Sequence, residues 1–88
     1  MKKVFESKGT FVDKFEVDYN EDTKMIQQIT LRLGDKSEEQ LHLPVHIDFW
    51  CDIQKEILEE GAKEGFKGTP MYDLIKEMID KIGGLKNE

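Results

Sequence analysis

Four side chains in the middle of the chain could bind a metal ion or carry out acid–base and nucleophilic chemistry. They are His42, His46, Asp48 and Cys51, and their imidazole, carboxylate and thiolate groups all suit zinc. Their spacing matches no metal-binding motif, because Pro44 separates the two histidines and no Cys-x-x-Cys or His-Glu-x-x-His sequence is present. On a helix, His46 and Cys51 would lie about 140° apart, which is unfavourable for sharing a proton. The sequence therefore predicts no catalytic residues, no metal site and no cofactor, with a small metal protein or enzyme built on these four residues as the alternative.

A second group of residues could bind a partner through charge. Asp48, Asp52, Glu56 and Glu60 recur at every fourth position and Glu59 lies beside them, so a helix would present these carboxylates along one side. Like charges at this spacing destabilise a helix by about 0.2 to 0.5 kcal/mol per pair. A row of like charges that destabilises its own helix indicates a functional role. These five residues are therefore predicted to contact a partner.

The charge balance indicates what kind of partner this is. The 88 residues include 19 acidic and 13 basic side chains, a net charge of −6, and the acidic excess lies in residues 16–68. A negative potential over the middle of the chain repels phosphate, so direct binding to nucleic acid or to anionic lipid is not expected. A protein with a basic surface is the expected partner. The single cysteine and the lack of a long apolar run after Met1 predict a cytoplasmic protein without a disulfide or a membrane span.

Three stretches of alternating apolar and polar residues predict β-strands that each bury one face. The apolar positions are Phe11, Phe15, Val17 and Tyr19 in the first stretch, Met25, Ile29, Leu31 and Leu33 in the second, and Leu41, Leu43 and Val45 in the third. Polar turns separate the stretches, which predicts an antiparallel meander. Val4 and Phe5 would add one more strand at the start, and Pro44 confines the last strand to an edge or ends it there.

The apolar spacing changes from two to three and four near His46, which is typical of helices. Residues 46–65 are predicted to form one amphipathic helix, whose apolar residues occupy roughly half of the helical wheel. Residues 69–83 are predicted to form a second helix. Thr69 as the capping residue and Pro70 in the first helical position mark its start, and a glycine pair marks its end.

Strands followed by helices are typical of the α+β class. We therefore expect one domain over residues 1–88, with a three- or four-stranded antiparallel meander sheet in residues 1–45, both helices packed on one face of it, and a frayed tail at residues 84–88. The predicted core consists of Phe11, Phe15, Val17, Ile29, Leu31, Leu43, Trp50, Ile57, Leu74, Ile75, Met78 and Ile79.

The other face of the sheet is predicted to be open to water or to a partner. Its residues are Val12, Lys14, Glu16, Asp18, Ile26, Gln28, Thr30, Arg32, Gln40 and His42. Apolar Val12 and Ile26 on this face, together with Phe49 and Phe66, form a second candidate contact surface. Through the open sheet face the protein could form a homo-oligomer, so a self-associating structural subunit is a further alternative.

In size, acidity and order of elements, the chain resembles small phage-encoded proteins that inhibit bacterial defence nucleases by occupying their nucleic-acid sites. That resemblance implies an anti-CRISPR-like nucleic-acid mimic. These inhibitors share no catalytic motif, so the resemblance assigns a role to no residue of this chain. The sequence thus predicts a small acidic, non-enzymatic module that occupies a basic surface of a partner protein, with a nuclease inhibitor as an alternative.

Overall fold

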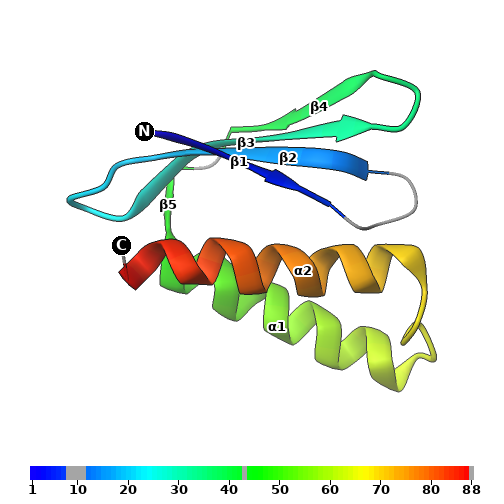
Figure 1. Ribbon diagram of the computed structural model, residues 1–88. Helices are drawn as coiled ribbons and strands as arrows, with labels where there is room; N and C mark the ends of the chain where they lie inside the picture. Colours follow the sequence, from blue (N-terminus) through cyan, green and yellow to red (C-terminus); the bar gives the residue numbers. More distant parts are fainter. Residues whose placement is uncertain (8–11, 43, 88) are drawn as a thin grey trace.

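A computed structural model describes residues 1–7, 12–42 and 44–87, and it places a sheet on one side of the molecule and two helices on the other (Figure 1). The main strands are β1 (Lys2–Glu6), β2 (Val12–Tyr19), β3 (Met25–Leu33) and β4 (Glu38–Leu41). They lie in the order β1-β2-β3-β4, and each strand pairs antiparallel with the next. The predicted α+β class and antiparallel meander are therefore confirmed, and the first strand around Val4 makes the meander four-stranded.

The last predicted strand is divided into two short ones. After β4, the chain forms β5 (Val45–His46), which pairs with the first residues of β3, Met25 and Ile26. β4 pairs with the later residues of the same edge of β3. Pro44 lies between the two segments, where it needs no ladder hydrogen bond, so the predicted confinement of this strand to an edge is observed.

A register shift in β2 turns Val12 into the core. Between Val12 and Lys14, β2 advances by two residues while β3 advances by one, from Leu33 to Arg32. The extra residue is a β-bulge, which reverses the side on which the following side chains lie. Val12 is consequently 1% exposed and belongs to the same buried cluster as Phe15, so its predicted place on the open sheet face is wrong.

A second register shift, in β3, turns the Ile26 side chain into the core. β2 advances by one residue from Asp18 to Tyr19, while β3 advances by two, from Gln28 to Ile26. Ile26 and Ile29 are both 0% exposed, although three positions separate them. The placement of Ile26 on the open face is therefore also wrong, because strict alternation does not hold across a bulge.

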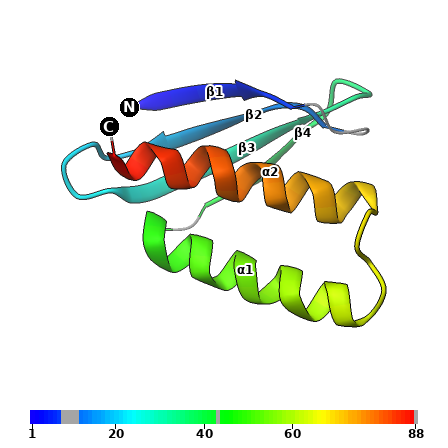
Figure 2. The ribbon, with the colours of Figure 1, turned by 60° about the horizontal axis from the view of Figure 1, so that its bottom comes forward.

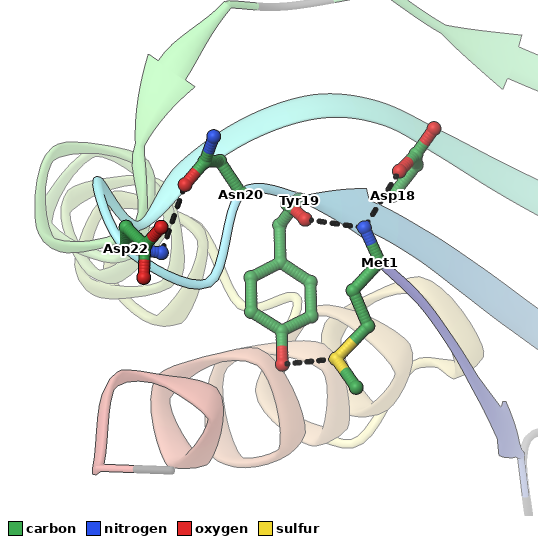
Figure 3. Close-up of polar contacts among 5 residues, drawn as sticks. All are labelled: Met1, Asp18, Tyr19, Asn20 and Asp22. Carbon is green, nitrogen blue, oxygen red and sulfur yellow. Dashed lines mark hydrogen bonds and ion pairs between the residues drawn. The ribbon is translucent and has the colours of Figure 1, made fainter.

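The contacts at Tyr19 hold the start of the chain to β2 (Figure 3). The Met1 nitrogen donates a hydrogen bond to the Tyr19 carbonyl oxygen at 2.9 Å and lies 3.6 Å from the Asp18 carboxylate. The Tyr19 hydroxyl donates to the Met1 sulfur at 3.5 Å, and the tyrosine is buried. Asn20 begins the next turn, where its side-chain oxygen accepts a hydrogen bond from the Asp22 N–H at 2.8 Å. These contacts fix the end of the sheet to which the helices are attached.

The two helices agree with the predicted segments to within two residues. They are α1 (Ile47–Lys63) and α2 (Pro70–Gly84), and a short 3₁₀ helix, η1 (Leu85–Asn87), follows. Thr69 caps α2 as expected, since its hydroxyl oxygen accepts a hydrogen bond from the Tyr72 N–H at 3.3 Å. No helix in the described part of the chain is long and apolar enough to cross a membrane.

Residues 85–87 form the 3₁₀ helix η1, at positions where the sequence predicted a frayed tail. Leu85 is 1% exposed because it extends the apolar spacing of Met78 and Ile82 by three more residues. The Lys24 ammonium also donates a hydrogen bond to the Leu85 carbonyl oxygen at 3.3 Å. The glycine pair ends α2 as predicted, and burial of Leu85 holds the 3₁₀ helix η1 that follows it.

The core lies between the sheet and the helices. Its buried residues are Val12, Phe15, Val17, Tyr19, Ile26, Ile29, Ile47, Trp50, Cys51, Leu74, Met78, Ile82 and Leu85, with Leu31 and Ile79 partly buried against them. Most of the predicted core residues that the structure describes are among these. Phe11 and Leu43 lie outside the described residues. Ile57 is a clear error, because it is 47% exposed.

The position of α1 explains this error. α2 lies directly against the sheet along its length, whereas α1 begins at β5 and lies farther from the sheet than α2 toward its C-terminal end (Figures 1 and 2). The buried residues of α1, which are Ile47, Trp50 and Cys51, accordingly all lie in its first two turns. Leu41 of β4 pairs with buried Ile29 yet is exposed, so no helix covers that edge of the sheet.

Two buried isoleucines and one exposed isoleucine test this arrangement. Ile82→Ala and Ile26→Ala are each expected to lower the free energy of unfolding by about 2 to 5 kcal/mol, because both side chains are fully buried. The same substitution at Ile57 is expected to cost less than about 1 kcal/mol, because α1 leaves that side chain in water. Urea denaturation of the three variants measures the difference. A loss at Ile57 equal to that at Ile82 would contradict the described position of α1.

Candidate functional site

The acidic row, defined as Asp48, Asp52, Glu56, Glu59 and Glu60, lies on the exposed side of α1. All five side chains are exposed, and they extend from the first turn of the helix almost to its end. Lys55 and Lys63 are the basic residues of the same helix, so α1 carries five negative and two positive side chains. The acidic row makes this the strongly negative side of the helix layer.

Two members of the acidic row form ion pairs within the chain. The Asp48 carboxylate lies 2.8 Å from the Lys86 ammonium group, and the Glu60 carboxylate lies 3.4 Å from the Lys63 ammonium group. The hydrogen bond from Lys86 lowers the pKa of Asp48, and the same hydrogen bond raises the pKa of Lys86. Asp48 therefore joins the start of α1 to η1, a structural role that the sequence did not reveal.

The other three acids have no such partner. Among residues 1–7, 12–42 and 44–87, no basic group lies within ion-pair distance of Asp52, Glu56 or Glu59. Their carboxylates are exposed and therefore accessible to a positively charged partner. Of the predicted contact residues, these three offer the most unpaired charge.

An apolar row, defined as Phe49, Ile53 and Ile57, lies beside the acidic row. These side chains are 59%, 39% and 47% exposed, respectively. On a helical wheel, Ile53 and Ile57 lie about 40° and 80° from Phe49, because the three residues are spaced four apart. Glu56 and Glu60 lie within about 20° of Phe49 on the same wheel. The sequence did contain a signal for this surface, because an apolar arc over half of a helix is wider than one neighbouring helix covers.

The apolar row leads to a groove between the end of α1 and the start of α2. The groove has a volume of about 290 Å³ and an almost entirely apolar lining that includes Ile57, Leu58, Phe66, Met71 and Ile75. Phe66 and Met71 are both more than half exposed. Large apolar side chains from two helices and their connection thus form one continuous exposed surface.

Backbone hydrogen bonds fix the connection that carries Phe66. Gly65 has φ of 87°, its N–H donates to the Ala62 carbonyl oxygen, and the Phe66 N–H donates to that of Gly61 at 2.8 Å. These are the two hydrogen bonds of a Schellman motif, and the positive φ explains the glycine. The Thr69 hydroxyl donates to the Phe66 carbonyl oxygen at 2.8 Å, so the cap of α2 also holds Phe66 in place.

In the cluster considered for metal or nucleophilic chemistry, three of the four residues make structural contacts. The Nδ1 atom of His46 accepts a hydrogen bond from the Asp48 N–H at 3.1 Å and so caps α1, while His42 is exposed just after β4. Cys51 is buried, and burial raises the pKa of its thiol, which disfavours the reactive thiolate. Within the described ranges, no three His, Cys, Asp or Glu side chains are placed to hold a metal ion.

The open sheet face is polar because Val12 and Ile26 turn into the core. Lys14, Glu16 and Arg32 are among the residues that line it, and an ion pair of 3.6 Å joins Arg32 to Glu38. The second candidate contact surface is therefore divided, since Phe49 and Phe66 lie in the helix layer and the two aliphatic residues are buried. Neither of the two apolar residues that the sequence placed on the sheet face, Val12 and Ile26, is exposed there.

The exposed side of α1 thus combines unpaired carboxylates with adjacent apolar side chains. Protein contact surfaces use apolar residues for burial and charged residues for orientation and steering. No protein-family model, curated protein or solved structure matches this chain. A function therefore has to be inferred from the chemistry of this surface.

The capping role of His46 gives a prediction that separates it from His42. His46→Ala is expected to lower the free energy of unfolding by about 1 kcal/mol, because the Asp48 N–H loses its acceptor. His42→Ala is the matched control and should leave stability unchanged. Urea denaturation at about pH 8, where free imidazoles are neutral, measures both effects.

Elemental analysis of the same samples tests the metal alternative. A zinc content of one per chain that survives dialysis and is lost in either histidine variant would contradict the capping interpretation.

The Asp48–Lys86 pair predicts a pH dependence of stability. The pKa of Asp48 is lower in the folded protein, so its contribution is present above its ordinary pKa of 3.8 and disappears as the pH falls through the folded value. Asp48→Asn should therefore be less stable than the unmodified chain at neutral pH, and the difference should vanish on acidification. Asp52→Asn, one turn along α1 and without an ion pair, is the control. Thermal unfolding between about pH 2 and pH 7 measures both; an unchanged difference at the lowest pH would exclude the charged pair as its cause.

Proposed function

We propose that the protein is a small, non-enzymatic binding module that occupies a basic surface of a partner protein through α1. The observation that carries this proposal is the presence of three exposed carboxylates, at Asp52, Glu56 and Glu59, which have no ion-pair partner among the described residues and lie directly beside an exposed apolar row. Neither group is needed for the core. Both are therefore free to serve a contact.

Electrostatics supports a basic rather than an acidic or phosphate-bearing partner. Like charges a turn apart repel along α1, and a positive surface placed against them relieves this repulsion. Charges at the rim of an interface also steer the encounter and raise the association rate at low salt. A nucleic-acid-binding groove of a nuclease is one class of basic protein surface, so the inhibitor hypothesis is a special case of the same mechanism.

Neutralising the three unpaired acids tests the proposal. The variant Asp52→Asn/Glu56→Gln/Glu59→Gln should keep its stability or gain a few tenths of a kcal/mol, because like-charge repulsion is relieved. Its binding to a basic protein partner should weaken, and the salt dependence of binding should largely disappear. The measurement is affinity capture with the unmodified chain and the variant as parallel baits, followed by calorimetric titration of each captured protein at about 0.05 M and 0.5 M salt.

The control removes the same number of charges elsewhere. Glu21→Gln/Asp73→Asn/Asp80→Asn changes three acids outside α1 and should bind the captured partner as the unmodified chain does. Equal weakening by both triple variants would show a general effect of net charge. Undiminished binding by the α1 variant at low salt would overturn the proposed role of the acidic row.

A further inference from the structure

We propose that the segment of the partner that docks on α1 is a basic amphipathic helix, whose apolar side chains pack along the apolar row toward the groove at Phe66. This inference rests on the proposed function and specifies the partner of the same surface. It is carried by three features of the helix layer, which are the uncovered apolar residues, the fixed geometry of the groove and the charge at its border.

The apolar surface is concentrated on the helix layer. Phe49, Ile53, Ile57, Phe66 and Met71 are all substantially exposed, while the other exposed large apolar residues in the described part of the chain, Met1, Val4 and Leu41, lie on the sheet side. The row from Phe49 to Ile57 rises about 12 Å along α1, and the groove continues it toward α2. This length fits about two to three turns of a docked helix.

The fold itself leaves this surface uncovered. α1 lies farther from the sheet toward its C-terminal end (Figure 2), and Phe49, Ile53 and Ile57 along it are exposed. α1 also has its backbone hydrogen bonds satisfied within the helix, so a partner contacts it through side chains rather than by adding a strand. An amphipathic helix seated in an apolar groove is the recurrent solution for such a surface.

The groove is preorganised. The Schellman motif at Gly65 and the hydrogen bond from the Thr69 hydroxyl to the Phe66 carbonyl oxygen fix the aromatic residue next to Ile57 and Met71. A contact surface whose backbone is already ordered loses less conformational entropy on binding than a flexible loop. The geometry therefore favours docking without rearrangement.

The charge on α1 favours a basic partner over a second copy of the chain as the molecule that docks on the apolar row. Glu56 and Glu60 border the apolar row and Asp52 lies one turn earlier, and α1 itself carries five acidic and two basic side chains. Two copies packed through α1 would bring two acidic rows together, and juxtaposed like charges oppose association. Lysine or arginine residues on one flank of a docked helix would instead pair with Asp52 and Glu56.

Two synthetic peptides test the inference with the full chain. The first is a 16-residue leucine–lysine peptide with leucines at helical spacing, and the second has the same composition in an order without an apolar face. Fluorescence anisotropy should show tighter binding of the first peptide to the unmodified chain. Ile53→Ser and Ile57→Ser should each weaken that binding about tenfold or more, the loss expected when one large aliphatic contact is removed. Val4→Ser, at a position on the sheet that is 55% exposed, is the control and should have no effect.

The outcomes separate this inference from the proposed function. Loss of binding to both peptides in the acidic triple variant supports the proposed function, and failure of the unmodified chain to bind either peptide at low salt would overturn both. Equal affinities for the two peptides, unaffected by the serine substitutions, would overturn the docked helix while the charge-based contact stands. Sedimentation equilibrium that shows a dimer, dissociated by Ile57→Ser, would mean that a second copy occupies the surface and would overturn the docked partner helix.

Backbone amide NMR spectra of the unmodified chain provide a test that needs no variant. Addition of the amphipathic peptide should shift the signals of Phe49, Ile53, Ile57 and Phe66. Shifts confined to the sheet would place the docking site elsewhere and overturn the inference.

Discussion

His46 ends β5 and caps α1, so no linker separates the sheet from the first helix. Its backbone pairs with Met25, and its Nδ1 atom accepts a hydrogen bond from the Asp48 N–H. The neighbouring Ile47 N–H donates to the Lys24 carbonyl oxygen at 3.0 Å. The direction of α1 is thus fixed at its start, within one or two residues of an edge strand. The positions of α2, of the core and of the exposed surface all depend on that direction.

The far end of the chain returns to the same junction. The Lys24 ammonium donates to the Leu85 carbonyl oxygen, and Lys86 pairs with Asp48 in the first turn of α1. These two contacts hold the C-terminal end of α2 in place against the sheet. The buried residues of α2, which are Leu74, Met78 and Ile82, supply much of the helical contribution to the core. Since α2 occupies the space under the sheet, α1 is held mainly by its first two turns and by packing on α2.

This arrangement separates the residues that stabilise the fold from those that could bind. The buried side chains of α1 lie at its start, whereas its apolar row and its unpaired acids extend toward the other end, where the groove begins. Ile57 and Glu56 are exposed, so neither belongs to the buried core that contains Trp50. A binding surface built this way can be strongly charged and apolar at once, because the sheet and α2 hold the fold without it.

The sequence by itself determined the type and order of the elements, because strand alternation, helical spacing and the Thr69–Pro70 cap are local properties that need no partner. It also determined that Asp52, Glu56 and Glu59 share one side of a helix. The face of Val12 and Ile26 depended on bulges, which exist only where two strands pair, so only the tertiary structure decided it. The exposure of Ile57, the burial of Leu85 and the pairing of Asp48 with Lys86 were likewise decided there, because each depends on which element lies next to the residue rather than on its position along its own helix.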